Sequence, residues 1–441
     1  MFFKYLQSII LFIFSINLLA GEVHEFTLDN GLKLIVKEDH RAPVVVSQVW
    51  YKVGSSYEQE GKTGLSHLLE HMMFKGTKNY AVGEFNRIMA INGASQNAFT
   101  GLDYTAYFQT IENTRLPISF ELEADRMRGL VLVEDEFVKE REVVKEERRT
   151  RTDDRPTGLL YEYFRATAYQ TSSYQNPVIG WMDDIGNLQL ADLQTWYQQW
   201  YAPNNATVVV VGDVQPEAVL KLAKQYFGPL QPSEIKPPNP RLEVEQFGTK
   251  QITVKRPAKL PNLMLGYKVP VLATKPEQWE VYALEVLAYL LDGGDSTRLP
   301  KNLIRGQQIA SSVGAGYNFF ARLESLFTIQ GVPTDKHTMQ ELETAIYAQV
   351  KQLQDELVSQ QELEMVKTKL QANQVYELDS LFYQGMKIGL LETIGLDWRI
   401  FDDYLANIKA VTAEQIQQVS RKYLIKEHLT VAKLEPLEVD K

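Results

Sequence analysis

Hydrophobic positions in residues 64–74 recur at the three- and four-residue spacing that predicts an α-helix with one buried side. At about 100° per residue, Leu65, Leu68, Leu69 and Met72 form a single apolar stripe. The polar side chains of the segment fall on the opposite side of the helix. We therefore expect the apolar stripe to pack in the core and the polar side to be available for chemistry.

Three residues on that polar side, His67, Glu70 and His71, form a candidate metal centre. Imidazoles four residues apart lie one above the other on a helix, so both can reach one ion. Neutral imidazole is the commonest metal ligand, and a nitrogen-rich site suits zinc. Glu70 projects beside the same position and can take a proton from a metal-bound water. The alternative is a polar helix face that happens to carry two of the chain's six histidines.

A second predicted helix, further along the chain, supplies carboxylates. Glu140, Val143, Val144 and Glu147 follow an i, i+3, i+4, i+7 pattern and share one face. Glu146 lies about 110° from the centre of this face. A buried carboxylate must be paired or bound to a metal. We therefore expect Glu147 to point inward and Glu146 to point toward solvent.

The H-x-x-E-H pattern of residues 67–71 resembles that of the pitrilysin-type inverted-motif zinc peptidases, which include insulysins and mitochondrial processing peptidases. The resemblance implies one zinc ion per chain, held by His67, His71 and a glutamate on a second helix. The family's spacing selects Glu147 for that third ligand and gives Glu140 a supporting role. It implies that Glu70 acts as general base on zinc-bound water.

Residues 1–20 have the pattern of a secretory signal peptide. Lys4 is their only charge, residues 9–14 are the apolar centre, and Ala20 and Gly21 supply small residues at a cleavage point. The alternative is an uncleaved anchor, although the apolar stretch is short for one. No later stretch is long and apolar enough to span a bilayer. We expect an exported protein, periplasmic or extracellular, with no membrane association after the signal is removed.

The amino-acid composition excludes some kinds of metal site and disfavours some kinds of partner. The chain has no cysteine, which excludes a disulfide framework and a thiolate metal site. Its net charge of −10 makes nucleic acid an unfavourable partner. The length is sufficient for two globular domains without such supports.

The chain should form two related α+β domains, 22–228 and 246–436, joined by a proline-rich linker over 229–245. The pattern of residues 191–209 recurs in residues 412–432, which indicates an internal duplication. In the resembling family each domain is a mainly antiparallel sheet covered by helices, and two domains form half of a clamshell. The second copy has no H-x-x-E-H pattern and is expected to carry no metal.

Other elements are predicted from periodicity and turn residues. The segments are a hairpin over 25–37, strands at 44–51, 206–211, 251–255, 311–317 and 326–332, and helices at 83–91, 115–131, 133–151, 191–200, 279–291, 339–357 and 361–378. The basic run 148–151 is interpreted as a solvated helix end.

Residues 93–101 are small and polar and surround a predicted strand. In the resembling family this strand is an open sheet edge near the metal, where the peptide substrate adds as a further strand. The resemblance implies that Asn97, Ala98 and Phe99 contact the substrate. The alternative is an ordinary edge strand.

The second half of the chain lacks one part of the family's site. Arg305 matches an arginine that accompanies the substrate site in catalytically complete members, where a tyrosine follows it. The tyrosine position is occupied here by Ser311 or Ser312, and Tyr317 lies too far along. The resemblance therefore implies a heterodimer with a related subunit that carries the arginine–tyrosine pair. A homodimer is the alternative.

We interpret the chain as a zinc endopeptidase subunit that hydrolyses extended peptides or small unfolded polypeptides. The intact ligand set and Glu70 favour this interpretation. One alternative is a non-catalytic peptide-binding or assembly subunit with the same fold. Another is an extracytoplasmic scaffold without metal.

Overall fold

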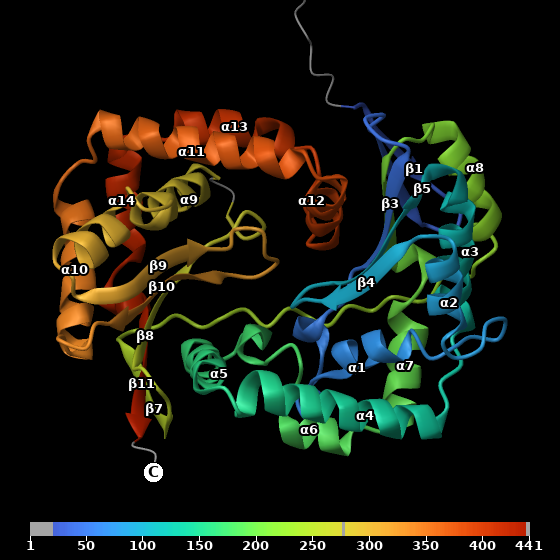
Figure 1. Cartoon of the computed structure of the whole chain (residues 1–441), viewed down its shortest axis with the longest axis horizontal. Helices are drawn as coiled ribbons and strands as arrows, with labels where there is room; N and C mark the ends of the chain where they lie inside the picture. The colour runs from blue at the N-terminus through green and yellow to red at the C-terminus, as the bar shows by residue number, and fades with distance from the viewer. Residues whose placement is uncertain (1–20, 276–277, 438–441) are drawn as a thin grey trace, which may run out of the picture.

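The structure, a computed structural model, describes residues 21–275 and 278–437. The predicted signal segment lies outside these residues. In Figure 1 the first part of the chain, in blue and green, forms the right half of the molecule, and the later part, in yellow to red, forms the left half. Each half contains one sheet and its own helices. Within the described part of the chain, no helix has the length and apolar character needed to cross a membrane.

The first sheet has six strands in the order β1-β2-β6-β3-β5-β4. Their bounds are β1 (Val23–Thr27), β2 (Lys33–Glu38), β3 (Val44–Tyr51), β4 (Ser95–Thr100), β5 (Thr105–Glu112) and β6 (Ala206–Gly212). All neighbours are antiparallel except β2 and β6, which are parallel. Strand β4 lies at one edge and pairs with β5 alone.

The second sheet has five strands in the order β7-β11-β8-β10-β9. Their bounds are β7 (Lys250–Pro257), β8 (Asn262–Val269), β9 (Ala310–Tyr317), β10 (Ser325–Pro333) and β11 (Leu429–Leu437). The one parallel pair is β7 with β11. Without β1, the first sheet has the same order and the same single parallel pair. The prediction of an α+β fold with two related, mainly antiparallel sheets is therefore confirmed.

Fourteen α-helices surround the sheets in the described part of the chain. Those of the first half are α1 (Leu65–Met72), α2 (Glu84–Ile91), α3 (Leu116–Gly129), α4 (Glu134–Arg148), α5 (Pro156–Ala168), α6 (Met182–Asn187), α7 (Leu190–Trp200) and α8 (Pro216–Tyr226). Those of the second half are α9 (Trp279–Asp292), α10 (Met339–Asp355), α11 (Gln360–Leu378), α12 (Leu381–Thr393), α13 (Ile400–Ala410) and α14 (Ala413–Tyr423). Periodicity did not predict α5, α6, α8, α12, α13 or β8. In α12 two glycines lower the intrinsic helix propensity, so packing must stabilise the helix.

The two halves exchange one helix each. Helix α12 packs on β3 and β6 of the first sheet, and α5 packs on β7 and β11 of the second. Each helix also lies close to a glycine contact: a Cβ at Gly389 of α12 would overlap the indole of Trp50 on β3, and a Cβ at Gly266 of β8 would overlap the ring of Phe164 on α5. Each sheet therefore buries one face under a helix that belongs, in sequence, to the other half.

The segment between α8 and β7 contains no helix or strand but is anchored to both halves. The carboxylate of Glu243 accepts backbone N–H groups of Gln170, Thr171 and Ser172 at 2.9–3.0 Å. It also lies 2.5 Å from the ammonium of Lys268. Both partners of this ion pair are almost fully buried, so the segment is held in place rather than acting as a free tether.

Candidate metal centre

Helix α1 buries the apolar stripe that its sequence predicts. Leu65, Leu68, Leu69 and Met72 are at most 3% exposed and belong to the core of the first half. The helix packs against β4, α7 and α4. Its polar side faces α4, because the stripe faces the core.

A buried carboxylate caps the start of α1. Glu58 accepts the backbone N–H groups of Gly64 at 2.8 Å and Ser66 at 2.7 Å. Burial raises the pKa of Glu58 to about 7, although the two backbone hydrogen bonds favour its charged form. A carboxylate at this end complements the helix dipole and holds the first turn of the metal-site helix.

Two histidines of α1 and one glutamate of α4 converge. The distance from His67 Nε2 to Glu147 Oε1 is 3.8 Å, and that from His71 Nε2 to Glu147 Oε2 is 3.4 Å. One donor atom from each residue lies within 4.8 Å of the other two. Zinc binds such atoms at about 2.0–2.2 Å in tetrahedral geometry, which separates ligand atoms by about 3.3 Å. The three side chains therefore fit one zinc ion and leave a fourth position for water or substrate.

Glu140 orients one of the histidines. Its Oε2 lies 3.1 Å from His71 Nδ1, and its Oε1 lies 2.6 Å from the ammonium of Lys75. The hydrogen bond with His71 lowers the pKa of Glu140. A proton held on Nδ1 by this carboxylate leaves Nε2 free to ligate, which is how outer partners commonly orient metal-binding histidines.

The two imidazoles differ in charge preference. Burial and the neighbouring charge of His71 lower the pKa of His67 to about 4. Burial opposes the charge of His71 too, but hydrogen bonds with Glu140 and Glu147 outweigh it and raise the pKa of His71 to about 9. His67 is thus ready to ligate as a neutral ring. Metal binding must displace a proton from His71.

Glu70 lies beside this group without joining it. Its carboxylate accepts a hydrogen bond from the hydroxyl of Thr100, at the end of β4. Burial raises the pKa of Glu70, and the Thr100 hydrogen bond opposes the rise. A carboxylate with a raised pKa is a stronger proton acceptor near neutral pH. Thr100 lies in the small and polar stretch 93–101, but the sequence alone did not predict its hydrogen bond with Glu70.

Two expectations for α4 are wrong. Val143 is 48% exposed, whereas Val144 is fully buried, so the inward face is centred on Val144 rather than between the two valines. Glu147 still faces the histidines and Glu146 points to solvent, because a rotation of this size moves neither across the helix. Arg148 is not part of a solvated end, since it is 4% exposed.

The partners of the basic run explain its placement. Arg148 donates to Glu162 of α5 at 2.7 Å and to the carbonyl oxygen of Gly180 at 2.9 Å. Beyond α4 the chain continues as a π-helical segment, Arg149–Asp153, whose Arg151 lies 2.6 Å from Glu147 Oε1. The pair of Arg151 with Glu147 spans four residues, so helical spacing offered a signal for it that the interpretation of this run as a solvated end did not use.

The predicted substrate strand is β4, an edge strand. Asn97 is exposed, and its side-chain oxygen accepts the backbone N–H of Ala98 at 2.9 Å. Phe99 packs edge-on against Trp50, with ring centroids 5.5 Å apart. The outer side of β4 pairs with no strand in the described part of the chain. A peptide strand can therefore add beside Ala98 if it displaces the Asn97 side chain.

The second-half residues lie apart from the metal centre. Arg305 is exposed on a π-helical turn before β9, and Ser311 and Ser312 are exposed on β9 itself. Strand β9 belongs to the left half in Figure 1 and α1 to the right half. The hydroxyl of Tyr317 donates to the carbonyl oxygen of Pro270 and is thus occupied within its own half.

Two family descriptions cover most of the chain. Residues 33–181 match Insulinase (Peptidase family M16), and residues 187–370 match Peptidase M16 inactive domain. The first range contains α1 and α4, with the candidate metal centre. The second contains four of the five strands of the second sheet.

Proteins of similar sequence carry protease names. The chain is 38% identical over 358 residues to the zinc protease PqqE of Helicobacter pylori, and the match covers 80% of each. It is 25% identical to a Bacillus subtilis protein named uncharacterized zinc protease YmxG, over 94% of this chain and 98% of that protein.

Solved structures show the same fold. A protease from Helicobacter pylori superimposes with a TM-score of 0.89 at 34% identity, covering 94% of this chain and 100% of that one. The periplasmic protease PqqL of Escherichia coli superimposes with a TM-score of 0.81 at 19% identity. That match covers 94% of this chain but 48% of the longer protein, so the fold described here accounts for about half of it.

Proposed function

Because this chain belongs to the M16 family of peptidases, we propose that it acts as a zinc-dependent endopeptidase subunit. The observation that carries the proposal is the convergence of His67, His71 and Glu147 with a separate carboxylate, Glu70, at their side. Three protein ligands with a fourth position open are typical of catalytic rather than structural zinc sites.

The residues around the zinc position have different roles in catalysis. Zinc bound to His67, His71 and Glu147 would supply Lewis acidity that polarises the scissile carbonyl. Glu140 keeps the ring of His71 in the ligating orientation. Glu70 takes the proton of the attacking water and then delivers it to the departing amine. Burial assists that transfer, since it raises the pKa of Glu70.

The substrate would be an extended peptide or a small unfolded polypeptide. The unpaired edge of β4 offers main-chain hydrogen bonding to an added strand, with Asn97, Ala98 and Phe99 in contact. Such binding places the peptide next to Thr100, whose hydroxyl reaches Glu70. Main-chain recognition makes little demand on sequence, which suits an enzyme for unfolded chains.

The test compares Glu70→Gln with wild type in zinc content and in cleavage of an unstructured peptide. We expect zinc to remain bound and hydrolysis to fall by about 10²- to 10⁴-fold, because an amide cannot take the proton. The control is Glu146→Gln, which changes an exposed carboxylate of α4. Full turnover in Glu70→Gln would remove this residue from the mechanism, and a wild-type chain that binds zinc without cleaving, both alone and with a related partner chain, would indicate a binding subunit.

We also propose that the active form is a heterodimer with a related chain that supplies the missing tyrosine. Ser311 and Ser312 are short, and Tyr317 is hydrogen-bonded within its own half. A preorganised hydroxyl at the developing negative charge increases turnover by about a hundredfold or more. Peptide cleavage should therefore rise by that factor when such a partner is added to the pure chain. Full activity of the pure chain, with no rise on mixing, would favour the homodimer.

We propose that the protein is exported, on the pattern of residues 1–20. N-terminal sequencing of the protein from cell fractions checks this. Residues 1–20 should be missing from an extracytoplasmic form, and an intact Met1 in the cytosolic fraction would contradict export.

A further inference from the structure

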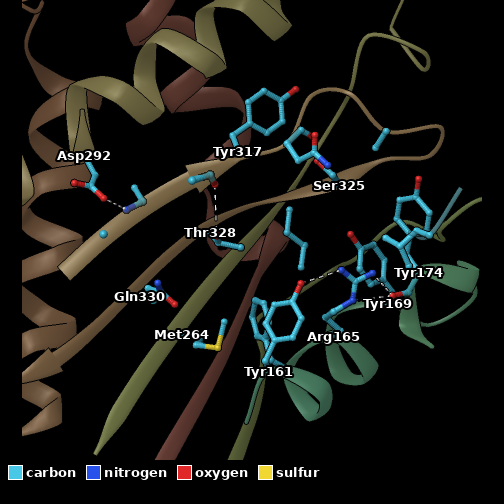
Figure 2. A pocket seen from close by; sticks show the side chains of 18 residues that line it. Tyr161, Arg165, Tyr169, Tyr174, Met264, Asp292, Tyr317, Ser325, Thr328 and Gln330 are labelled. Atoms are coloured by element: carbon cyan, nitrogen blue, oxygen red, sulfur yellow. Dashed lines mark hydrogen bonds between the residues drawn. The ribbon is translucent and has the colours of Figure 1, made fainter. Parts of the chain in front are cut away.

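A chamber of about 500 Å³ lies between α5 and the second sheet, outside the metal centre. Figure 2 shows four tyrosines around it, Tyr161, Tyr169, Tyr174 and Tyr317, with Arg165 pointing among them. Both α5, which carries Arg165, and β9 and β10 of the second sheet contribute to its walls. Residues of both halves therefore line the chamber.

The chamber continues toward the metal centre. A neighbouring cavity of about 550 Å³ shares Arg165, Tyr161 and Tyr174 with it. That second cavity extends to Arg151, the ion-pair partner of Glu147, and to Gly101, which follows Thr100. A peptide strand that runs along β4 and past its end would thus enter these cavities.

Arg165 has no anionic partner of its own. Its Nε and one terminal nitrogen donate to the carbonyl oxygen of Tyr174 at 3.1 and 2.5 Å, and its other terminal nitrogen donates to the hydroxyl of Tyr161 at 3.2 Å. A guanidinium has five N–H donors, so two remain. In the described part of the chain no carboxylate forms an ion pair with Arg165. Arg148, by contrast, has Glu162.

This arrangement favours an anion from outside the chain. Arg165 is half-buried, and its positive charge is met by the faces of Tyr161, Tyr169 and Tyr174 and by neutral acceptors, so a carboxylate would add the charge-assisted partner that the guanidinium lacks. Tyr161 is 48% exposed, and its hydroxyl accepts from Arg165 while its own proton is available. Two free guanidinium donors and one hydroxyl match the geometry of a carboxylate. Phe164, Met264 and Leu326 supply apolar wall for the rest of a side chain.

We infer that this chamber is a second subsite for the peptide substrate and that Arg165, with Tyr161, binds a carboxylate of the peptide there. The carboxylate is that of an acidic side chain or of the peptide's C-terminus. The inference rests on the proposed function only in taking a peptide as the ligand. Asp292 lies at the far end of the chamber, where it accepts the backbone N–H of Ala315 at 3.2 Å, so a cationic ligand is the competing outcome.

The test measures binding and not turnover, so it remains informative if the chain proves inactive. Fluorescence anisotropy with the full chain in the Glu70→Gln background compares dye-labelled unstructured peptides that carry one glutamate, glutamine or lysine at successive positions. A charge-assisted pair should make the glutamate peptide bind about tenfold more tightly than the glutamine peptide at one position. Versions with a free or amidated C-terminus distinguish the terminal carboxylate from the side chain.

Variants then test whether Arg165 and Tyr161 cause the preference for the glutamate peptide. Arg165→Met should abolish it, and Arg155→Met, which removes an exposed charge at the start of the same helix, should not. Tyr161→Phe keeps the ring and should reduce the preference in part, which gives a second measurement if Arg165→Met does not fold. Equal binding of glutamate and glutamine peptides by the wild-type chamber, with free and amidated C-termini alike, overturns the inference. So does a preference for lysine, or an acidic preference that persists in folded Arg165→Met.

Discussion

The two halves share one sheet topology but place different helices against their edge strands. In the first half α1 packs on β4 and turns His67 and His71 toward α4. In the second half α9 packs on β9 and is buried on nearly all sides, because α11, α13 and α14 also cover it. The same position beside an edge strand thus holds the candidate metal centre in one half and packed apolar core in the other.

The difference shows what a metal site requires of a fold. Helix α1 is short, and its outer side meets carboxylates of α4 instead of apolar side chains. Helix α9 contains two buried glutamates: Glu280 pairs with Lys422 and Lys275, whereas Glu285 pairs with no basic residue in the described part of the chain. Burial and the charge of Glu377 raise the pKa of Glu285 to about 8. The partners decide the charge in both halves: Glu140 and Glu280 have basic partners and lowered pKa values, in Glu280 against the opposing effect of burial, whereas Glu285 has no such partner and tends to be neutral.

The largest expected effect is the loss of zinc affinity when a residue of the candidate metal centre is replaced. Glu147→Gln should weaken zinc binding by more than the ~10–100-fold that loss of an outer partner costs, because it removes a ligand. Glu146→Gln, one residue earlier and exposed, should bind zinc as wild type does. Competition with a chelator measures both affinities. Equal losses in the two variants would mean that the metal is held elsewhere.

A smaller effect concerns the exchange of helices that joins the halves. Gly389→Ala should lower the free energy of unfolding by about 1–3 kcal/mol, because the added Cβ overlaps Trp50 beneath α12. Gly186→Ala in α6 is the control, since its Cβ meets nothing within 4 Å. Denaturant unfolding compares the two. If Gly389→Ala is as stable as Gly186→Ala, the contact between α12 and the first sheet is looser than the structure shows.

A third effect, spread over several pH units, tests the neutral carboxyl group of Glu285 in α9. The ordinary pKa of Glu285 is 4.5 and its folded value is about 8, so the folded chain keeps a proton that the unfolded chain loses between these values. Stability from this group is therefore complete below pH 4.5 and decreases as the pH rises to about 8, by at most about 1.4 kcal/mol per pH unit.

Glu285→Gln should flatten that part of the stability profile, and Glu146→Gln should leave it unchanged. Thermal unfolding across this pH range provides the measurement. An unchanged slope in Glu285→Gln would assign the pH dependence to other groups.

Periodicity alone determined which side of α1 enters the core and which residues share its polar side. It also directed Glu147 inward and Glu146 outward, and the repeat of strand patterns predicted two related halves. These features are local, because a helix or strand sets the direction of its side chains by geometry that the sequence carries within a few turns. Proline and glycine marked several strand and helix ends in the same way.

Only the tertiary structure decided which neighbour each face meets. Val143 is exposed and Arg148 buried because α4 meets α5 and the Gly180 turn on a side that periodicity cannot specify. The exchange of α5 and α12 includes close contacts at glycines whose importance appears only when Trp50 and Phe164 lie against them. Arg165 enters a chamber built from both halves, through contacts between elements that pack together only in the folded chain. Pairings of this kind arise from the packing of whole elements, which a local pattern does not encode.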